Sequence, residues 1–343
     1  MVLFIFIWLL LLLSAIGYNK RNAGYDILYF LFFILLLVVA SGRAEGVGVD
    51  TTTYMSIYNT IRRLGYLPYL EPGWNVLNII GTKLGLTFNE FLFVPSFLML
   101  FPIFYIAKKL CGNPFWPILI YFSMHIYLAS FNVMRQYVAV SYVLMVYYLY
   151  FKGRNGWALL TLLFACSIHY SSILCIFGII FIKYIRITRE KIIIFFIMSL
   201  IMGSLINNDI LQRVSFMYSN YISNDVYRAD GASAMFLALI VNIFNVGLLV
   251  FSKKEILDNK WVGLYLLYII VLYLTYKLQL GARINVIFSI TQLIALPYIA
   301  LHTKTKPYYF VLGLVFVFCT LQFYRMLLSN ANDIAPYKSV WFG

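Results

Sequence analysis

The chain has 343 residues, of which 63% are apolar and only 11% are charged, and its formal net charge is +14. A soluble globular protein carries far more charge on its surface, so the composition excludes a soluble protein and indicates a chain that is solvated by lipid. The basic excess does not indicate a nucleic-acid partner, because the lysines and arginines lie in short clusters between apolar runs.

Uncharged apolar runs follow one another along most of the sequence. A helix crosses the hydrocarbon core of a bilayer with roughly 20 apolar residues, and solid runs favour helices over a closed barrel, which shows alternation instead. We therefore expect an all-α, polytopic integral membrane protein with about 10–12 membrane helices in a single membrane domain, residues 1–343. The runs are 2–17, 26–41, 88–107, 115–131, 134–151, 157–182, 191–206, 233–251, 261–279, 284–301 and 307–328.

The positions of the basic clusters predict the topology, because positively charged loops are retained in the cytoplasm. If every cluster lies inside, a single crossing by 157–182 would leave the cluster 183–191 on the wrong side. The conflict disappears if this run enters the membrane and returns, with a break near Ser167–Ser172. Irregular backbone at that depth must be buried in protein or line a cavity. We therefore expect His169 at the tip of a re-entrant helical hairpin that faces a cavity.

This topology places both termini outside, together with the segments 42–87, 207–232 and 329–343. Within the outer loop 42–87, the stretch 74–86 is semi-apolar, and Leu77, Ile80 and Leu84 fall at helical spacing. Such a pattern predicts an interfacial helix that lies on the outer leaflet or dips into it.

Ionisable residues stand at the predicted outer ends of several helices, where a charge normally faces the interior of the bundle. Arg135 has no aspartate or glutamate nearby in the sequence, and Gln279 and Arg283 flank a very short outer turn. Snorkelling to lipid headgroups is the alternative explanation for these side chains. Arginines with a few carboxylates and one histidine fit an anionic, phosphate-bearing lipid, because a guanidinium group matches phosphate oxygens in bidentate geometry.

The sequence contains no cluster with metal-ligand spacing and no nucleotide-binding or nucleophile-elbow motif. We therefore expect no metal, no cofactor and no nucleotide chemistry on the inner face.

Five short motifs occur in an order that resembles the EpsG-like branch of the Wzy-type polysaccharide polymerases. The resemblance extends over nearly the whole chain, with mild departures at Ile168, where the family usually has Phe, and at Ser172, where it has a smaller residue. The motifs are Arg43-(x4)-Gly48-x-Asp50-(x3)-Tyr54, Glu71-Pro72, Asn132-(x2)-Arg135-Gln136-(x2)-Ala139, Ile168-His169-Tyr170-Ser171 and Pro336-Tyr337-Lys338.

The resemblance implies a GT-C-like glycosyltransferase that joins oligosaccharide repeat units carried on undecaprenyl pyrophosphate, at the outer face of a bacterial inner membrane. The partners implied are these lipid-linked oligosaccharides, membrane lipids and a chain-length regulator. The protein has to bind the charge of the leaving pyrophosphate, orient both lipids and take up one proton.

The site residues that we predict fall into three groups. The pyrophosphate ligands are Arg135, Arg283 and Arg43; the catalytic residues are His169, which is the first choice for the base, then Glu71 and Asp50; and the substrate-positioning residues are Tyr54, Asn132, Gln136 and Gln279.

Two other functions fit the same composition. One is an O-antigen ligase or another lipid-phosphate-dependent GT-C glycosyltransferase. The other is a transporter that flips lipid-linked oligosaccharide without chemistry, although such transporters often carry internal repeats, and we find none in the sequence.

The topology is tested by cysteine labelling in intact cells. With Cys111, Cys166, Cys175 and Cys319 replaced by serine, a cysteine introduced at Arg186 is expected to react only after the membrane is permeabilised. Labelling of Arg186→Cys by an impermeant reagent added outside would disprove the re-entrant hairpin.

Overall fold

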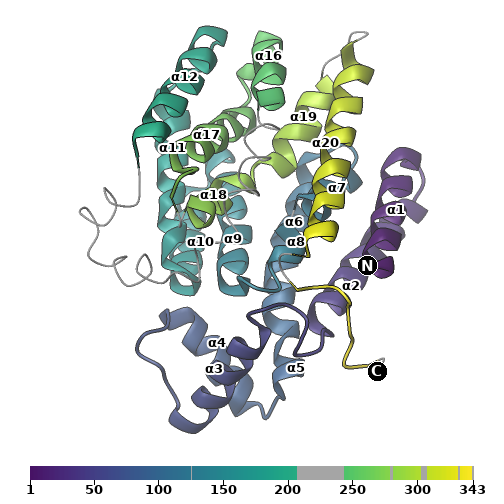
Figure 1. Cartoon of the computed structure of the whole chain (residues 1–343), viewed down its shortest axis with the longest axis vertical. Helices are drawn as coiled ribbons and strands as arrows, with labels where there is room; N and C mark the ends of the chain where they lie inside the picture. Colours follow the sequence, from purple (N-terminus) through teal and green to yellow (C-terminus); the bar gives the residue numbers. More distant parts are fainter. Residues whose placement is uncertain (125, 207–242, 279–280, 303–306, 331–332, 342–343) are drawn as a thin grey trace. The chain divides into compact units, whose positions relative to one another are not determined.

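The computed structural model describes the chain except for residues 125, 207–242, 279–280, 303–306, 331–332 and 342–343 (Figure 1). Every regular element in the described part is a helix, and the only β-type pairing there is an isolated bridge between Arg43 and Ser339. The predicted all-α class is therefore confirmed. The predicted outer loop 207–232 lies outside the described residues.

The chain forms two compact units. The first consists of Met1–Ile173 and Cys319–Gly343, and the second of Leu174–Phe318. A single membrane domain can contain two such units, so the one-domain prediction stays a prediction.

The first unit begins with ten helices and a 3₁₀ turn, η1. They are α1 (Val2–Gly17), α2 (Gly24–Ser41), α3 (Thr51–Leu64), α4 (Pro72–Lys83), α5 (Phe88–Phe91), α6 (Phe93–Leu110), α7 (Phe115–Ser123), α8 (Ile126–Ala129), α9 (Met134–Phe151), α10 (Asn155–Ile168) and η1 (Tyr170–Leu174).

The second unit packs around α17. Its helices are α11 (Cys175–Tyr184), α12 (Arg189–Leu205), α16 (Lys254–Leu257), α17 (Lys260–Thr275), α18 (Gly281–Ser289) and α19 (Gln292–His302), and α20 (Pro307–Ser329) begins there and ends in the first unit.

Among the described residues, two helical stretches are long and apolar enough to cross a bilayer, Gly24–Ser41 and Phe88–Leu110. A third is added if α18 and α19, which meet at a bend of 50°, form one broken span. Several shorter apolar helices of 10–17 residues accompany them in the described part of the chain. A multi-pass helical membrane protein is thus indicated, while the count of about 10–12 membrane helices stays a prediction.

The predicted break in the run 157–182 is confirmed. Helix α10 ends at Ile168, and His169 has extended backbone dihedrals (φ −154°, ψ 114°) before the 3₁₀ turn begins. Because α10 and α11 belong to different units, a hairpin between them stays a prediction.

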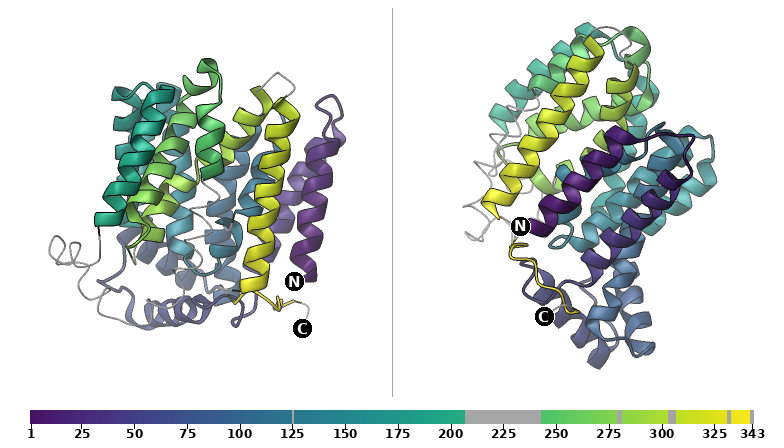
Figure 2. Two further views of the ribbon diagram at one scale, coloured as in Figure 1. Left: turned by 45° about the horizontal axis from the view of Figure 1, so that its top comes forward. Right: turned by 90° about the vertical axis from the view of Figure 1, so that its right-hand side faces the viewer.

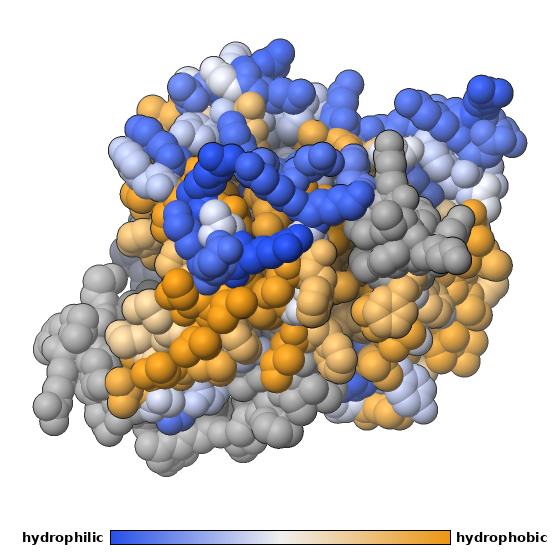
Figure 3. Space-filling view, turned by 90° about the horizontal axis from the view of Figure 1, so that it is seen from above, coloured by the Kyte–Doolittle hydropathy of each residue, from blue (hydrophilic) through white to orange (hydrophobic). Residues whose placement is uncertain are grey.

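The two ends of the first unit differ in chemistry. At one end, Lys108 at the end of α6 pairs with Asp26 at the start of α2. Figure 3 looks at the molecule from above and shows groups of hydrophilic residues beside exposed hydrophobic ones. Helices α3, α4 and α5 lie at the opposite end of this unit (Figure 1), so the Lys108–Asp26 pair and the polar segment 42–87 lie at opposite ends of it.

The stretch predicted to form an interfacial helix is helical, as α4, and its position at a membrane surface stays a prediction. The faces of α4 are inverted relative to those of a helix in a soluble protein. Val76, Ile80 and Leu84 are 50–70% exposed, whereas Asn75 and Asn78 are buried. An amphipathic helix that turns its apolar face outward is suited to a leaflet surface.

The C-terminal segment pairs with the residues that follow α2. The Ala44 amide donates to the Lys338 carbonyl (2.9 Å), and the Val340 amide donates to the Gly42 carbonyl (2.9 Å). Figure 2 shows α20 running beside α1 in both views, and the rings of Trp8 and Phe323 stack with centroids 5.5 Å apart. The first and last family-like motifs of the sequence therefore lie side by side.

Helix α4 approaches α10 closely at Gly73. A Cβ at this position would lie 2.3 Å from Ser167 Oγ and 2.8 Å from the Ser167 carbonyl oxygen. No side chain fits between the two helices without displacing backbone.

Gly73→Ala is therefore expected to destabilise the protein by about 1–3 kcal/mol, the usual cost of overpacking. Thermal unfolding in detergent measures the effect. Gly156→Ala is the control, because a Cβ on Gly156 in α10 meets nothing within 4 Å. An unchanged melting temperature for Gly73→Ala would show that α4 and α10 are not held this close.

Candidate functional site

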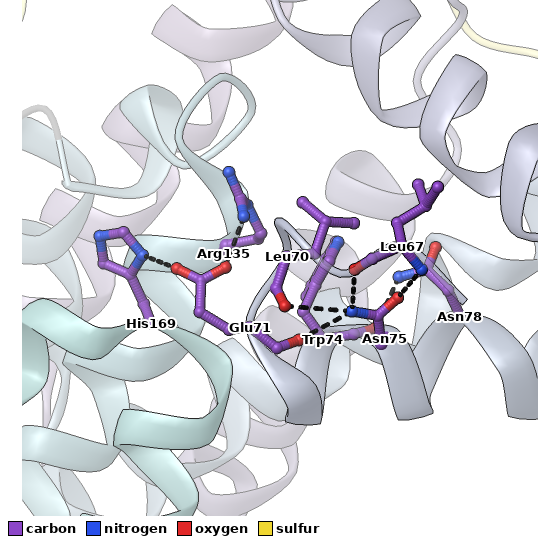
Figure 4. A network of polar contacts seen from close by, with 8 residues as sticks. All are labelled: Leu67, Leu70, Glu71, Trp74, Asn75, Asn78, Arg135 and His169. Carbon is purple, nitrogen blue, oxygen red and sulfur yellow. Dashed lines mark hydrogen bonds and ion pairs between the residues drawn. The ribbon is translucent and has the colours of Figure 1, made fainter. Parts of the chain in front are cut away.

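The side chain of Glu71 lies at the centre of a polar cluster in the first unit (Figure 4). Glu71 Oε2 accepts a hydrogen bond from Arg135 Nη1 at 2.5 Å, and Glu71 Oε1 lies 2.8 Å from His169 Nδ1. The exposed fraction of the side chain is 8% for Glu71, 27% for Arg135 and 21% for His169. The structure thus brings together one carboxylate, one guanidinium group and one imidazole from three separate sequence motifs.

Local sequence places Glu71 at the start of α4. It is the N-cap residue, with extended backbone (φ −58°, ψ 141°), and Pro72 occupies the first helical turn. Proline disfavours helical backbone in the residue before it and is preorganised for the first position of a helix. The Glu71-Pro72 dipeptide therefore fixes both the beginning of α4 and the direction in which the carboxylate leaves the chain.

The amide side chain of Asn75 holds the loop before Glu71. Its Nδ2 group donates to the carbonyls of Leu67 (2.8 Å) and Leu70 (3.1 Å), and its Oδ1 accepts from the Leu67 amide (3.0 Å). A fully buried side-chain amide with these partners pins a turn that has few backbone hydrogen bonds of its own. Figure 4 shows this network directly beside Glu71.

Arg135 lies in the first turn of α9, where the helix dipole disfavours a cation. Its pairing with Glu71 offsets that cost. Arg135 also forms a side-chain hydrogen bond with Tyr54, a buried residue of α3. The guanidinium group therefore connects α3, α4 and α9.

The contacts of Glu71 determine its protonation. Burial alone would raise the pKa of its carboxyl group, but the hydrogen bond from His169 and the charge of Arg135 outweigh burial, so the pKa lies below the usual 4.5. Glu71 is therefore ionised at neutral pH.

The ionised carboxylate also fixes the tautomer of His169. An ionised carboxylate only accepts hydrogen bonds, so His169 Nδ1 carries the proton and donates it to Glu71. In the neutral ring, Nε2 then has a free lone pair.

Trp74 and Ser172 are buried polar residues of this region that the sequence analysis missed. Trp74, one turn after Glu71, is 1% exposed, and its Nε1–H has no hydrogen-bond partner; the hydroxyl groups of Ser171 and Ser172 have none either. Buried polar atoms are normally satisfied, so three orphans beside one cluster indicate groups that a ligand or water completes. Trp74 lies three residues after Glu71, so the two side chains are neighbours on a helix. This spacing in the sequence could have identified Trp74 as a candidate.

Asn132 and Gln136 are buried in the same motif as Arg135, at 7% and 2% exposure. Gly48 lies against Asn132, because a Cβ on Gly48 would come within 2.7 Å of Asn132 Oδ1. Gly48 also has φ +88°, a conformation that favours glycine. Asp50 is the N-cap residue of α3, four residues before Tyr54.

Arg43 is placed differently from the other predicted arginines. It is 1% exposed, donates to the carbonyls of Ala40 and Phe131, and stacks on the Phe131 ring at 4.9 Å. Burial lowers its pKa to about 10, which still leaves it charged at neutral pH. These contacts connect the end of α2 to the segment just before α9, the helix that carries Arg135. Direct contact of Arg43 with a substrate stays a prediction.

Two further predicted residues lie elsewhere. Arg283 is exposed on α18 in the second unit, so its participation in this cluster stays a prediction. Gln279 lies outside the described residues.

The family model of the EpsG family matches residues 26–339. The chain belongs to the EpsG family. This membership indicates a polymerase-like function in polysaccharide biosynthesis and a multi-pass membrane protein. No curated protein and no solved structure matches the chain significantly.

Because the pKa of Glu71 is lowered in the folded protein, its carboxylate stabilises the fold above the unfolded value of 4.5, and this stabilisation is lost as the pH falls through the folded value. Glu71→Gln is therefore expected to melt below the wild type at pH 7, with a gap that shrinks below pH 4.5. Melting curves between pH 7 and pH 3.5 measure the gap. Glu45→Gln, which changes an exposed carboxylate in the same outer segment, should show no gap, and a Glu71→Gln gap that is constant with pH would refute the ionised carboxylate.

Proposed function

We propose that the protein is a polysaccharide polymerase, a glycosyltransferase that joins oligosaccharide repeat units carried on undecaprenyl pyrophosphate. The observation that supports this most is the buried Glu71 carboxylate held between Arg135 and His169. The cluster contains a base and a cation for an anionic leaving group, and family membership supports the class of reaction.

His169 is the proposed general base. Its Nε2 takes the proton from a hydroxyl group of the incoming repeat unit as that oxygen bonds to the anomeric carbon of the growing glycan. Glu71 orients the ring and stabilises the imidazolium that forms. Glu71 itself is the weaker choice of base, because two hydrogen-bonded partners and a lowered pKa hold it in the ionised state.

Arg135 is the proposed pyrophosphate ligand. As the new glycosidic bond forms, the bond from the anomeric carbon to the pyrophosphate oxygen breaks, and its electron pair leaves with the pyrophosphate. A guanidinium group has five N–H donors, so Arg135 has donors left besides those that bond Glu71 and Tyr54, and at 27% exposure it is open to a ligand. Such a preorganised donor stabilises charge as it develops.

The orphan donors Trp74 Nε1, Ser171 Oγ and Ser172 Oγ are the proposed partners of sugar hydroxyl groups or of ordered water. A site that hydrogen-bonds a substrate through buried polar groups discriminates strongly against analogues that lack the matching group. They therefore belong to the specificity of the site.

The proposed location is the outer face of a bacterial inner membrane. The site lies at the end of the first unit opposite the Lys108–Asp26 end, and basic loops are retained inside. The outward apolar face of α4 would rest in the outer leaflet and bring lipid-linked substrates to Glu71. The proposed chemistry requires no metal.

Purified protein in liposomes, supplied with a synthetic undecaprenyl-pyrophosphate repeat unit, tests the proposal. A ladder of products with and without chelator is the expected result. If product forms only as a single transfer to a lipid acceptor, the protein is a ligase, and if several plausible substrates stay unconsumed while labelled substrate crosses the bilayer, it is a transporter.

Arg135→Lys tests the role of the guanidinium fork. Lysine keeps the charge but loses one of two parallel hydrogen bonds, and a charge-assisted bond contributes roughly 1.5–3 kcal/mol. Polymer formation per folded protein should fall about ten- to a hundredfold, and Arg135→Ala should abolish it. Arg63→Lys, at an exposed position of α3, is the matched control. Wild-type turnover of Arg135→Lys would reduce Arg135 to a snorkelling or structural residue.

A further inference from the structure

The second unit contains a basic cavity that the proposed reaction does not use. It has a volume of about 280 Å³ and lies between the α11–α12 connection and the start of α17. The residues on its wall include Lys183, Tyr184, Ile185, Arg186, Asp258, Asn259 and Lys260. Two segments about 70 residues apart in the sequence therefore build one cavity.

The charges on the cavity wall favour an anion. Lys183, Arg186 and Lys260 supply three cations against the single carboxylate of Asp258. Arg186 Nε lies 3.7 Å from Asp258 Oδ1, but both side chains are largely exposed, at 69% and 46%. A surface pair of this kind is weak, so Arg186 remains available to a stronger anionic partner.

The N-terminus of α17 adds to the positive charge at the cavity. Helix α17 begins at Lys260 on the cavity wall, and its N-terminus carries a partial positive charge. Asn259 Oδ1 accepts a hydrogen bond from the Trp261 amide at 2.8 Å.

An apolar stripe leads away from the cavity along α11. Phe177, Ile180 and Tyr184 follow one another at i, i+3 and i+7 and are 60%, 46% and 72% exposed. Tyr184 also lines the cavity, and Lys183 Nζ lies 5.2 Å from the centre of its ring. A ligand with a charged head and a long apolar chain could contact the cavity and the stripe together, which a free phosphate ion could not.

We propose that this cavity binds the phosphate headgroup of an anionic phospholipid, with an acyl chain along Phe177, Ile180 and Tyr184. Basic pockets between membrane helices at the inner leaflet bind such headgroups. The cavity is built by the second unit and the Glu71 cluster by the first, and the lipid proposal does not depend on the proposed polymerase reaction.

Native mass spectrometry of the full-length protein in neutral detergent measures the binding. The wild type should bind phosphatidylglycerol in preference to phosphatidylcholine, and inorganic phosphate should not compete at equal concentration. Lys183→Gln combined with Lys260→Gln should weaken phosphatidylglycerol binding roughly 10- to 30-fold. The control, Lys152→Gln combined with Arg154→Gln, removes the same charge from a basic cluster of the first unit and should leave binding unchanged.

A second variant tests whether binding depends on the shape of the cavity as well as on its charge. Ile185→Trp fills the cavity and keeps every basic residue, so it should also weaken phosphatidylglycerol binding. Three results would each overturn the proposal in favour of non-specific attraction to a basic surface. They are an equal loss of binding in the Lys152/Arg154 control, unchanged binding in Ile185→Trp, and full competition by inorganic phosphate.

Discussion

The pairing of one buried carboxylate with a guanidinium group and an imidazole organises the end of the first unit that contains α3, α4 and α5. Glu71 is too buried to be solvated by water, and an unpaired charge in that position would be costly. Arg135 and His169 supply the compensation, and each comes from a different helix end, so the ion pair and the imidazole bond tie α4 to α9 and to the end of α10. The same contacts that stabilise the carboxylate also produce a histidine with one free nitrogen and an arginine with unused donors, which are the groups that the proposed reaction needs.

This cluster depends on supports that carry no chemistry themselves. Asn75 fixes the loop that delivers Glu71, and Gly73 allows α4 to lie against Ser167, two residues before His169. On the other side, Arg43 holds the segment before α9 through carbonyl and ring contacts, and the C-terminal segment pairs with the residues beside Arg43. A strained or mobile site would lose the sub-ångström positioning on which transition-state stabilisation depends. In the proposed reaction, these polar supports would hold Glu71, Arg135 and His169 in place without contacting a substrate themselves.

The distribution of polarity explains why such a site can exist in a chain that is 63% apolar. Helix α4 buries its asparagines and exposes its isoleucine and leucine, which is the arrangement that a lipid solvent favours and water does not. Polar side chains are then buried in the interior, where most of them have hydrogen-bond partners and a few, such as the Trp74 indole N–H, have no partner among the described residues. In the second unit, charged side chains also gather at helix ends, because the cavity beside Lys183 and Lys260 lies at the end of α11 and the start of α17.

The sequence by itself determined the helical class, the membrane environment and the break at His169, because apolar runs, charge clusters and a polar interruption are local properties of the chain. It also singled out Glu71, Arg135 and His169 through a family-like order of motifs. It could not show that these three side chains meet, since they are 34 to 98 residues apart and only the packing of α4 against α9 and α10 joins them. Arg43 and Trp74 show the same limit: burial decided that Arg43 contacts backbone carbonyls and that the Trp74 indole N–H is left without a partner, and burial depends on which helices pack together.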